Sequence, residues 1–184
     1  MAGLDPLYIS VDVETAGPYP GRYSLLAIGA CLVDDPDEAF YTELRPASTE
    51  ADAEALAVSG LSLERLAAEG EPPEQGVGRF ASWVERVTPG DRRPVFVAFN
   101  APFDWMFMTD AFHRYLGHNP FGHSALDVKA LAMGVTGVGW LDTSFTAVAE
   151  RFGLEAALPH HALEDARLQA EVFRRILAAA EGAP

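Results

Sequence analysis

The sequence predicts a single α/β domain built on a mixed β-sheet. Its 184 residues are 49% hydrophobic and 22% charged, a mixture typical of a globular protein of one domain. Strand-like segments come first in the chain, and helical segments alternate with short strands later. No repeat, linker or low-complexity tract divides the chain, so we expect one domain over residues 1–184.

Three strands are expected before residue 45. Residues 7–13 are β-branched and apolar at one end and acidic at the other, which predicts a buried strand that ends in carboxylates. Residues 24–33 form a second long apolar run, and residues 40–44 alternate like a more exposed strand. Turns rich in Gly, Pro and Asp separate the three segments, so they predict an antiparallel meander.

Helical spacing begins after this meander. Apolar residues recur at intervals of three and four over residues 52–69 and 73–87, with Gly70 and Pro72 between the two segments. A short apolar run then predicts a buried strand, and Pro102 suits the first position of a helix. The remaining elements are expected as a strand near Ala125 and two helices at residues 143–152 and 162–179.

The charge balance excludes several classes of function. The chain has 27 acidic and 13 basic residues, a net charge of −14, which disfavours nonspecific binding to a nucleic-acid duplex. Only Lys129 is a lysine, and no Gly-x-x-x-x-Gly-Lys-Ser/Thr motif occurs, which argues against a P-loop or Schiff-base enzyme. A nucleic-acid partner stays compatible with this charge if the contact is short and mediated by cations.

The single cysteine and the N-terminus indicate the compartment. Cys31 lies in an apolar run and is predicted to be a small buried residue rather than a reactive thiol. No segment approaches the ~18 to 20 apolar residues of a membrane span, and no signal-like region precedes residue 7. We therefore expect a cytoplasmic protein without a membrane anchor.

Three segments carry acidic residues that suggest chemistry. Asp12 and Glu14 are two residues apart at a strand end, so both carboxylates should project from one side of the sheet. Asp104 follows a buried strand among aromatic residues, and Asp165 begins the last helix after His160. Desolvated carboxylates that lie together favour Mg²⁺ or Mn²⁺. For each segment alone, however, a structural role is the preferred interpretation: solvated acids at a strand end for Asp12 and Glu14, and a favourable charge at a helix N-terminus for Asp165.

Taken together, these segments resemble the DEDDh branch of the 3′–5′ exonucleases, which includes ribonuclease T. Asp12-Val13-Glu14-Thr15 matches the first family motif, and Asp104 follows Asn100 as in the second. The third motif, His-x-x-x-x-Asp, is matched by His160 and Asp165. The resemblance covers nearly the whole chain, from Tyr8 to Leu177.

The resemblance implies a ribonuclease H-like fold with a five-stranded mixed sheet flanked by helices. It also implies two Mg²⁺ or Mn²⁺ ions, held by Asp12, Glu14, Asp104 and Asp165. The expected reaction removes nucleoside 5′-monophosphates from the 3′ end of short single-stranded RNA or DNA. Relatives such as ribonuclease T are homodimers, so a homodimer is compatible.

Further residues follow from the resemblance. An aspartate at the position of Asp127 supports the active site in several relatives. Proofreading relatives carry a glutamate in the second strand, where this chain has Ala27. This chain therefore lacks one carboxylate near the metal ligands, which is expected to affect the affinity for metal more than the type of reaction.

A histidine should accept the proton of the attacking water, since its unperturbed pKa is near ~6.5. His160 fits the family spacing, whereas His161 would share a helical face with Asp165. We expect His160 to be the base, and His161 either to help position the loop or to be simply an exposed residue. Candidates for substrate contact are Thr15, Tyr19, Asn100 and Phe103, and core packing is the alternative for the aromatic side chains.

Three other functions compete with this interpretation. A proofreading exonuclease bound to a DNA polymerase would have the same motifs. A haloacid-dehalogenase phosphatase would use Asp12 as a nucleophile and Lys129 as its lysine, but it leaves His160 without a role. A noncatalytic nucleic-acid-binding module would not require four acids and a histidine.

Overall fold

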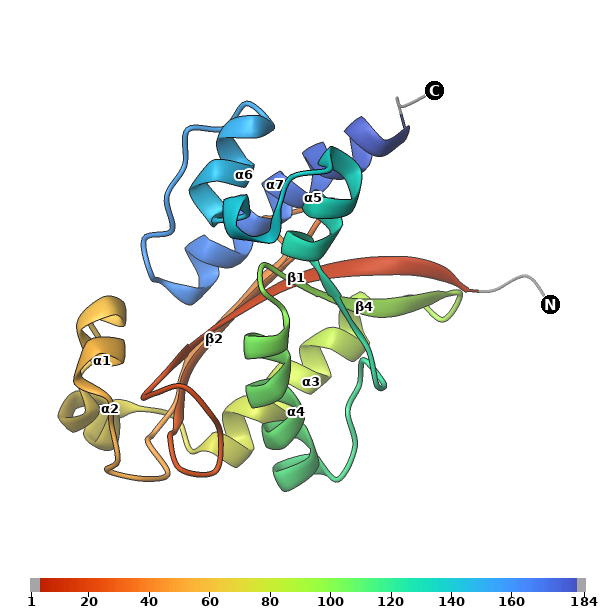
Figure 1. Cartoon of the computed structure of the whole chain (residues 1–184). Coiled ribbons are helices and arrows are strands. Elements are labelled where there is room, and N and C mark those ends of the chain that lie inside the picture. The colour runs from red at the N-terminus through yellow and green to blue at the C-terminus, as the bar shows by residue number, and fades with distance from the viewer. Residues whose placement is uncertain (1–3, 182–184) are drawn as a thin grey trace.

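The chain folds around a five-stranded mixed sheet, and the structure, a computed structural model, describes residues 4–181 (Figure 1). The strand order is β3-β2-β1-β4-β5, with β1–β2 and β2–β3 antiparallel and β4 and β5 running parallel to β1. The predicted mixed sheet and antiparallel meander are therefore confirmed. The strands are β1 (Asp5–Thr15), β2 (Leu25–Leu32), β3 (Ala39–Glu43), β4 (Arg92–Ala98) and β5 (Ala125–Asp127).

Helices form where the apolar spacing predicts them, with one difference. Residues 52–69, expected as one helical segment, form two helices because Gly60 adopts a left-handed conformation with φ of 66° and ends the first. The Ser62 side chain then accepts a hydrogen bond from the Arg65 N–H and caps the second. The helices are α1 (Ala53–Ser59), α2 (Leu63–Glu69), α3 (Pro73–Val87), α4 (Pro102–Leu116), α5 (Val128–Thr136), α6 (Phe145–Arg151) and α7 (Ala162–Glu181), with a 3₁₀ turn at Trp140–Asp142.

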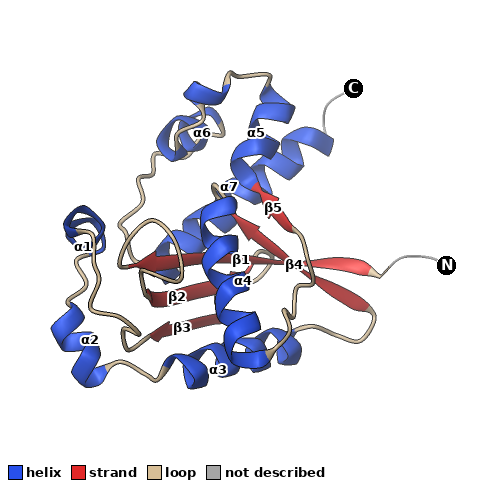
Figure 2. Cartoon of the chain, turned by 60° about the horizontal axis from the view of Figure 1, so that its bottom comes forward, coloured by secondary structure: helices blue, strands red, loops and turns tan. Residues whose placement is uncertain are grey.

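Helices cover both faces of the sheet. Helices α3 and α4 lie on one face and α5, α6 and α7 on the other, whereas α1 and α2 lie beyond the end of β1 (Figures 1 and 2). The larger core packs β1 against α3 and α4 through buried aromatic rings such as Phe80, Phe107 and Phe112. A second core packs β2 and β4 against α5, α6 and α7. The sheet is thus buried on both sides, which fixes β1 at the centre of the molecule.

The side chains of β1 alternate between these two cores. Val11 and Val13 are buried in the core formed with α3 and α4. Asp12 and Glu14 are partly exposed and lie on the side of α7, where Asp165 and Gln169 meet them. The predicted separation of the two carboxylates from Val11 and Val13 is therefore confirmed.

Two smaller predictions also concern the fold. Cys31 is buried on β2, and burial raises the pKa of its thiol to about 12, as expected for an unreactive core residue. Among the residues described, no helix combines the length and the apolar character that crossing a membrane requires.

Candidate active site

The four predicted acids meet around one cavity at the carboxyl end of β1. Asp12 and Glu14 come from the strand, Asp104 from the first turn of α4 and Asp165 from the first turn of α7. All four line a cavity of about 290 Å³. Residues separated by up to 153 positions in the sequence therefore share one site, as the motif comparison predicted.

Three of these carboxylates are close enough to share a cation. One oxygen from each of Asp12, Glu14 and Asp165 lies within 4.8 Å of the other two. The buried Oδ1 of Asp165 has no hydrogen-bond partner among the described residues, which leaves it available as a ligand. Carboxylate oxygens are the ligands that Mg²⁺ and Mn²⁺ prefer, so the donor set fits a divalent cation.

Small residues on β2 let α7 approach these carboxylates. Gly29 is paired with Asp12 in the sheet, and Ala27 is paired with Glu14. A Cβ atom on Gly29 would lie 2.2 Å from the backbone carbon of Ala162 and from the backbone nitrogen of Leu163. Only glycine allows this contact, and it brings the first turn of α7, with Asp165, to the strand that carries Asp12.

Asp104 has a different local environment from the other three acids. The pairing of β1 with β4 ends at Ser10 and Val97, so Val13 has no ladder partner in β4. The Val13 N–H instead donates a hydrogen bond of 3.1 Å to Oδ1 of Asp104. This bond fixes Asp104 at the edge of β1, and its carboxylate is not part of the group of three oxygens within 4.8 Å.

Burial and mutual repulsion raise the pKa values of all four acids. Burial raises the pKa of Asp12 well above its usual value, and the charges of Asp104, Glu14 and Asp165 raise it further, while the Gln169 hydrogen bond lowers it. Burial, with the charge of Asp165, raises the pKa of Glu14 to about 7. Clustered acids with raised pKa values are typical of sites that bind cations.

The other two acids follow the same rule. Burial raises the pKa of Asp104 to about 8, against the opposing effect of the Val13 N–H. Burial raises the pKa of Asp165 to about 6, and the charge of His160 and the backbone N–H groups of His160 and His161 oppose that shift. A divalent cation would favour the ionised form of each group.

Gln169 is a residue of the site that the sequence analysis missed. Its Nε2 donates a hydrogen bond of 2.6 Å to Oδ1 of Asp12, and its Oε1 accepts one of 2.9 Å from the Phe99 N–H. The side chain is buried on α7, one turn beyond Asp165. The sequence does offer one indication of this role, because Gln169 is a polar residue on the helix face that otherwise carries Ala166, Ala170 and Phe173.

The two adjacent histidines lie in different surroundings. His160 lines the acidic cavity and has a left-handed backbone with φ of 59°, a conformation that non-glycine residues rarely adopt. His161 is not among the residues that line the cavity, and its ring stacks on Tyr41 at a centroid distance of 4.7 Å. Of the two histidines, His160 therefore borders the acids, whereas the ring of His161 packs on β3; their roles in the reaction stay predictions.

Asp127 shapes the turn between β4 and α4. Its Oδ1 accepts hydrogen bonds from the backbone N–H groups of Asn100, Ala101 and Lys129, at 2.9, 3.2 and 3.1 Å. Asn100 adopts a left-handed conformation with φ of 64° in this turn. Asp127 does not line the cavity, so the structure places it as a support for the turn that leads to Asp104.

The predicted substrate contacts are only partly brought together. Thr15, Asn100 and Phe103 line the acidic cavity, and the Thr15 hydroxyl donates a hydrogen bond to the Gly17 carbonyl. Tyr19 does not line this cavity; its ring packs edge-on against Tyr23 at a centroid distance of 5.2 Å. A contact between Tyr19 and substrate stays a prediction.

Helix α1 forms a wall of the cavity that the sequence analysis did not identify. Glu54, Ala55 and Val58 line the cavity from this helix, and Phe99 and Leu158 add apolar surface. The Asp52 N–H donates to the Ala16 carbonyl at 2.7 Å, which fixes the start of α1 to the end of β1. Nothing in the spacing of residues 52–69 indicated that this helix borders the acids.

Comparison with known proteins gives a consistent result. A family model named RNase_T and described as an exonuclease matches residues 9–173. The 3′-5′ DNA exonuclease Cap18 of Escherichia coli is 45% identical over 170 residues, which are 92% of this chain and 91% of that protein. A DNA polymerase III of the PolC type from Thermotoga petrophila is 27% identical over 92% of this chain, but this match spans only 12% of the polymerase.

Solved structures share the fold. The nuclease domain of 3′hExo, a DEDDh family member bound to rAMP, superposes with a TM-score of 0.77 at 15% identity, over 95% of this chain and 92% of that one. A complex of Escherichia coli ExoI with single-stranded DNA gives a TM-score of 0.74 at 17% identity, over 95% of this chain and 41% of that one. These similarities confirm the ribonuclease H-like fold that the motifs implied.

Proposed function

Given that this chain belongs to the RNase_T exonuclease family and is a 3′–5′ exonuclease of single-stranded nucleic acid, we propose that DNA is its substrate. The relative that is 45% identical over 92% of the chain acts on DNA by its name, which supports this choice. The products would be nucleoside 5′-monophosphates, released one at a time. The observation that supports the chemistry best is the meeting of Asp12, Glu14 and Asp165 within 4.8 Å.

We assign the acids to cation binding in this reaction. Asp12, Glu14 and Asp165 would hold a divalent cation directly, and Asp104 would complete the site from the edge of β1. We propose two Mg²⁺ or Mn²⁺ ions, because phosphodiester hydrolysis develops negative charge at both the attacking and the leaving oxygen. Bound cations would also offset the four carboxylate charges that otherwise repel a phosphate.

The side chains around the acids have separate roles in this proposal. His160, which lines the cavity from the segment before α7, accepts the proton of the attacking water. Phe103 and Val58 provide apolar surface from opposite elements, α4 and α1, for the base of the terminal nucleotide. Thr15 and Asn100 supply polar groups that fix the sugar and phosphate.

Several sequence-based predictions extend the proposal. We propose that residues 1–184 form one exonuclease domain, supported by the family match over residues 9–173 on a single sheet. A cytoplasmic location is supported by the buried, unreactive Cys31. A homodimer is compatible with the exposed aromatic side chains Tyr19 and Trp140.

Proofreading beside a DNA polymerase is the second candidate function. The matches to PolC-type polymerases favour it, although they span only 12% of those proteins. The match to a stand-alone exonuclease over 91% of its length favours a separate enzyme. Adding a DNA polymerase and mismatched primers to the assay would distinguish these two candidates.

The proposal is tested with short 5′-labelled strands of DNA and RNA in the presence of Mg²⁺. A ladder of products that shorten stepwise from the 3′ end, faster for DNA, is the expected result. Asp12→Ala should abolish the ladder and also the hydrolysis of the p-nitrophenyl ester of thymidine monophosphate. Internal cleavage, or a trapped aspartyl phosphate, would contradict the assignment and favour an endonuclease or a phosphatase.

A further inference from the structure

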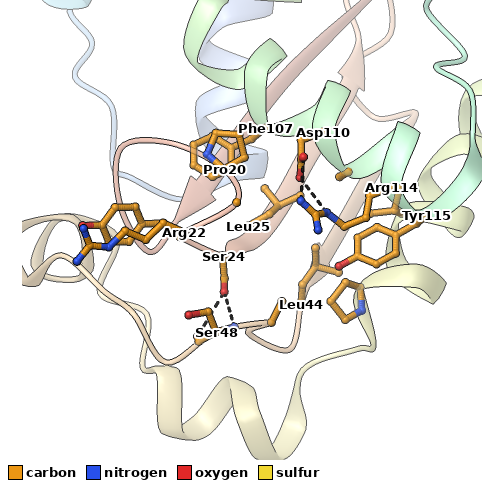
Figure 3. A pocket seen from close by; sticks show the side chains of 16 residues that line it. Pro20, Arg22, Ser24, Leu25, Leu44, Ser48, Phe107, Asp110, Arg114 and Tyr115 are labelled. Carbon is orange, nitrogen blue, oxygen red and sulfur yellow. Dashed lines mark hydrogen bonds and ion pairs between the residues drawn. The ribbon is translucent and has the colours of Figure 1, made fainter.

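A second cavity lies along the same helix as Asp104 but shares no lining residue with the acidic cavity. Its volume is about 170 Å³, and it lies between the loop after β1, the loop after β3 and the carboxyl-terminal half of α4 (Figure 3). We call it the α4 hollow. Its lining includes Leu25, Leu44, Ala47, Phe107, Arg114 and Tyr115.

The α4 hollow and the acidic cavity are lined by neighbouring residues of one face of α4. Phe103 lines the acidic cavity, and Phe107, one helical turn further, lines the hollow. The two rings are in contact, with centroids 5.4 Å apart. From Phe103 to Arg114 the helix rises about 16 Å, which at about 3.4 Å per stacked nucleotide spans five nucleotides, and fewer in a stretched strand.

The wall opposite α4 starts from the same strand as the catalytic acids. β1 ends at Thr15, which lines the acidic cavity, and the following loop reaches the hollow at Pro20. Ser24 and Ser48 tie this loop to the one after β3, because the Ser48 N–H donates to the Ser24 hydroxyl oxygen at 3.1 Å. The side of the hollow that faces α4 therefore starts from the strand that carries the acids, and this hydrogen bond ties its two loops together.

The chemistry of the hollow suits a nucleotide. Leu25, Leu44 and Phe107 provide an apolar floor, and Tyr115 stands at the rim beside Arg114 (Figure 3). Asp110 holds the Arg114 guanidinium through Nε at 3.1 Å and Nη2 at 3.0 Å, so its direction is fixed. Nη1 makes no hydrogen bond to any described residue, and a guanidinium suits both a phosphate and a base edge.

We propose that the α4 hollow is an upstream subsite that takes one base of the substrate strand while Arg114 contacts the neighbouring phosphate. This inference rests on the proposed function. A hollow of about 170 Å³ is below the ~300–1,000 Å³ of most ligand pockets, so it suits one base rather than a whole nucleotide. With a net charge of −14, the protein lacks long-range attraction for nucleic acid, so affinity depends on local contacts such as this one.

Dependence on strand length tests the proposal. The kcat and KM of wild type and Arg114→Gln are measured with Mg²⁺ on the p-nitrophenyl ester of thymidine monophosphate and on oligothymidylates of two to twelve nucleotides. The ester does not reach the hollow. We expect the ratio of kcat/KM for the longest strand to that for the ester to fall about tenfold in the variant, through KM.

Two further variants test whether the loss in Arg114→Gln comes from the hollow rather than from a general disturbance of the fold. Ala47→Trp, at an exposed position on the rim, should narrow the hollow and give the same length-selective loss. Arg151→Gln, at an exposed position in α6, should leave the ratio unchanged. An unchanged ratio in both hollow variants, or an equal loss on ester and strand, overturns the subsite.

The same experiment separates this subsite from the underlying activity. If wild type shortens strands but the ratio does not depend on Arg114 or Ala47, the exonuclease assignment stands and the subsite is wrong. If wild type shortens no strand and hydrolyses no ester, the proposed function fails, and the subsite fails with it. A peptide or second protein copy in the hollow would give the first of these results.

Discussion

The carboxamide of Gln169 connects the carboxylate of Asp12 to the backbone of Phe99. It donates to Asp12 at 2.6 Å and accepts from the Phe99 N–H at 2.9 Å. One side chain of α7 therefore sets the position of a β1 carboxylate relative to the end of β4. The amide can make both bonds only in one orientation, which fixes the Asp12 carboxylate before any cation binds.

Gln169→Leu should weaken cation binding more than it weakens the fold. The variant leaves Asp12 without its donor and Phe99 without its acceptor, so we expect Mn²⁺ affinity to fall about 10-fold or more and kcat to fall with it. Mn²⁺ binding is measured by electron paramagnetic resonance and kcat on a labelled strand. Gln75→Leu on α3, an exposed glutamine, is the matched control. Unchanged Mn²⁺ affinity in Gln169→Leu would show that the amide has only a packing role.

Gly29→Ala should displace the first turn of α7. The added Cβ would lie 2.2 Å from the backbone of Ala162, so we expect a loss of stability of about 1–3 kcal/mol together with loss of activity. Thermal unfolding and strand hydrolysis measure the two effects. Gly78→Ala, in α3, meets no atom within 4 Å and should raise stability by about 0.5–1 kcal/mol without changing activity. Full activity in Gly29→Ala would mean that α7 can shift without moving Asp165.

The metal-free protein should become less stable as the pH rises from 5 to 8. The pKa values of Asp165, Glu14 and Asp104 are raised to about 6, 7 and 8, so the folded state binds more protons than the unfolded state over this range. The stabilisation is complete below the unfolded pKa values near ~4 and is lost as the pH rises through the folded values. We expect a loss of at least about 3 kcal/mol, measured by urea unfolding in the presence of EDTA.

Two additions identify the origin of this pH dependence. Mg²⁺ at pH 8 should restore stability, because it binds the ionised acids of the folded state only. Asp104→Asn should reduce the difference between pH 5 and pH 8, whereas Asp91→Asn, at an exposed turn, should leave it unchanged. A metal-free protein that is equally stable at both pH values would contradict the environment described for these carboxyl groups.

His160→Ala should lower kcat by about 100-fold or more, because it removes the proposed proton acceptor. Folding and Mn²⁺ affinity should stay close to those of wild type, since the side chain is exposed and makes no described contact that holds the fold. His161→Ala should lower kcat far less, through loss of the stack on Tyr41. The opposite ranking of the two variants in single-turnover assays would reverse the assignment.

Most of the fold could be predicted because local signals agreed with the tertiary structure. Each strand was a β-branched or apolar run between turn residues, and Pro102 marked the start of α4. The division of residues 52–69 could have been predicted from Gly60, since a glycine followed shortly by Ser62 is a typical end and restart of a helix. The sequence analysis predicted one helical segment because the apolar residues recur at helical intervals on both sides of Gly60.

The acids could be found from sequence because their spacing follows the motifs of a family. Gln169 and α1 could not, because their roles depend on distances between elements that no local pattern specifies. The same holds for Gly29, whose importance comes from the approach of α7 rather than from a turn. Asp127 was found through the resemblance, and its carboxylate accepts hydrogen bonds from the backbone N–H groups of the turn that leads to Asp104.

Helix α1 has no buried side chain, although it forms one wall of the acidic cavity. Its Leu56 is only partly buried against the small cluster of Ala16, Leu26 and Leu66. An element that buries so little apolar surface opens by local unfolding at a small fraction of the global free energy, while β1 and α7 stay closed. The residues proposed for hydrolysis thus lie on stable elements, β1 and α7, whereas the wall that contacts the substrate lies on the less stable helix α1. Natural variation or laboratory evolution can rewrite residues 53–59 to accept other strand ends without disturbing the geometry on which hydrolysis depends.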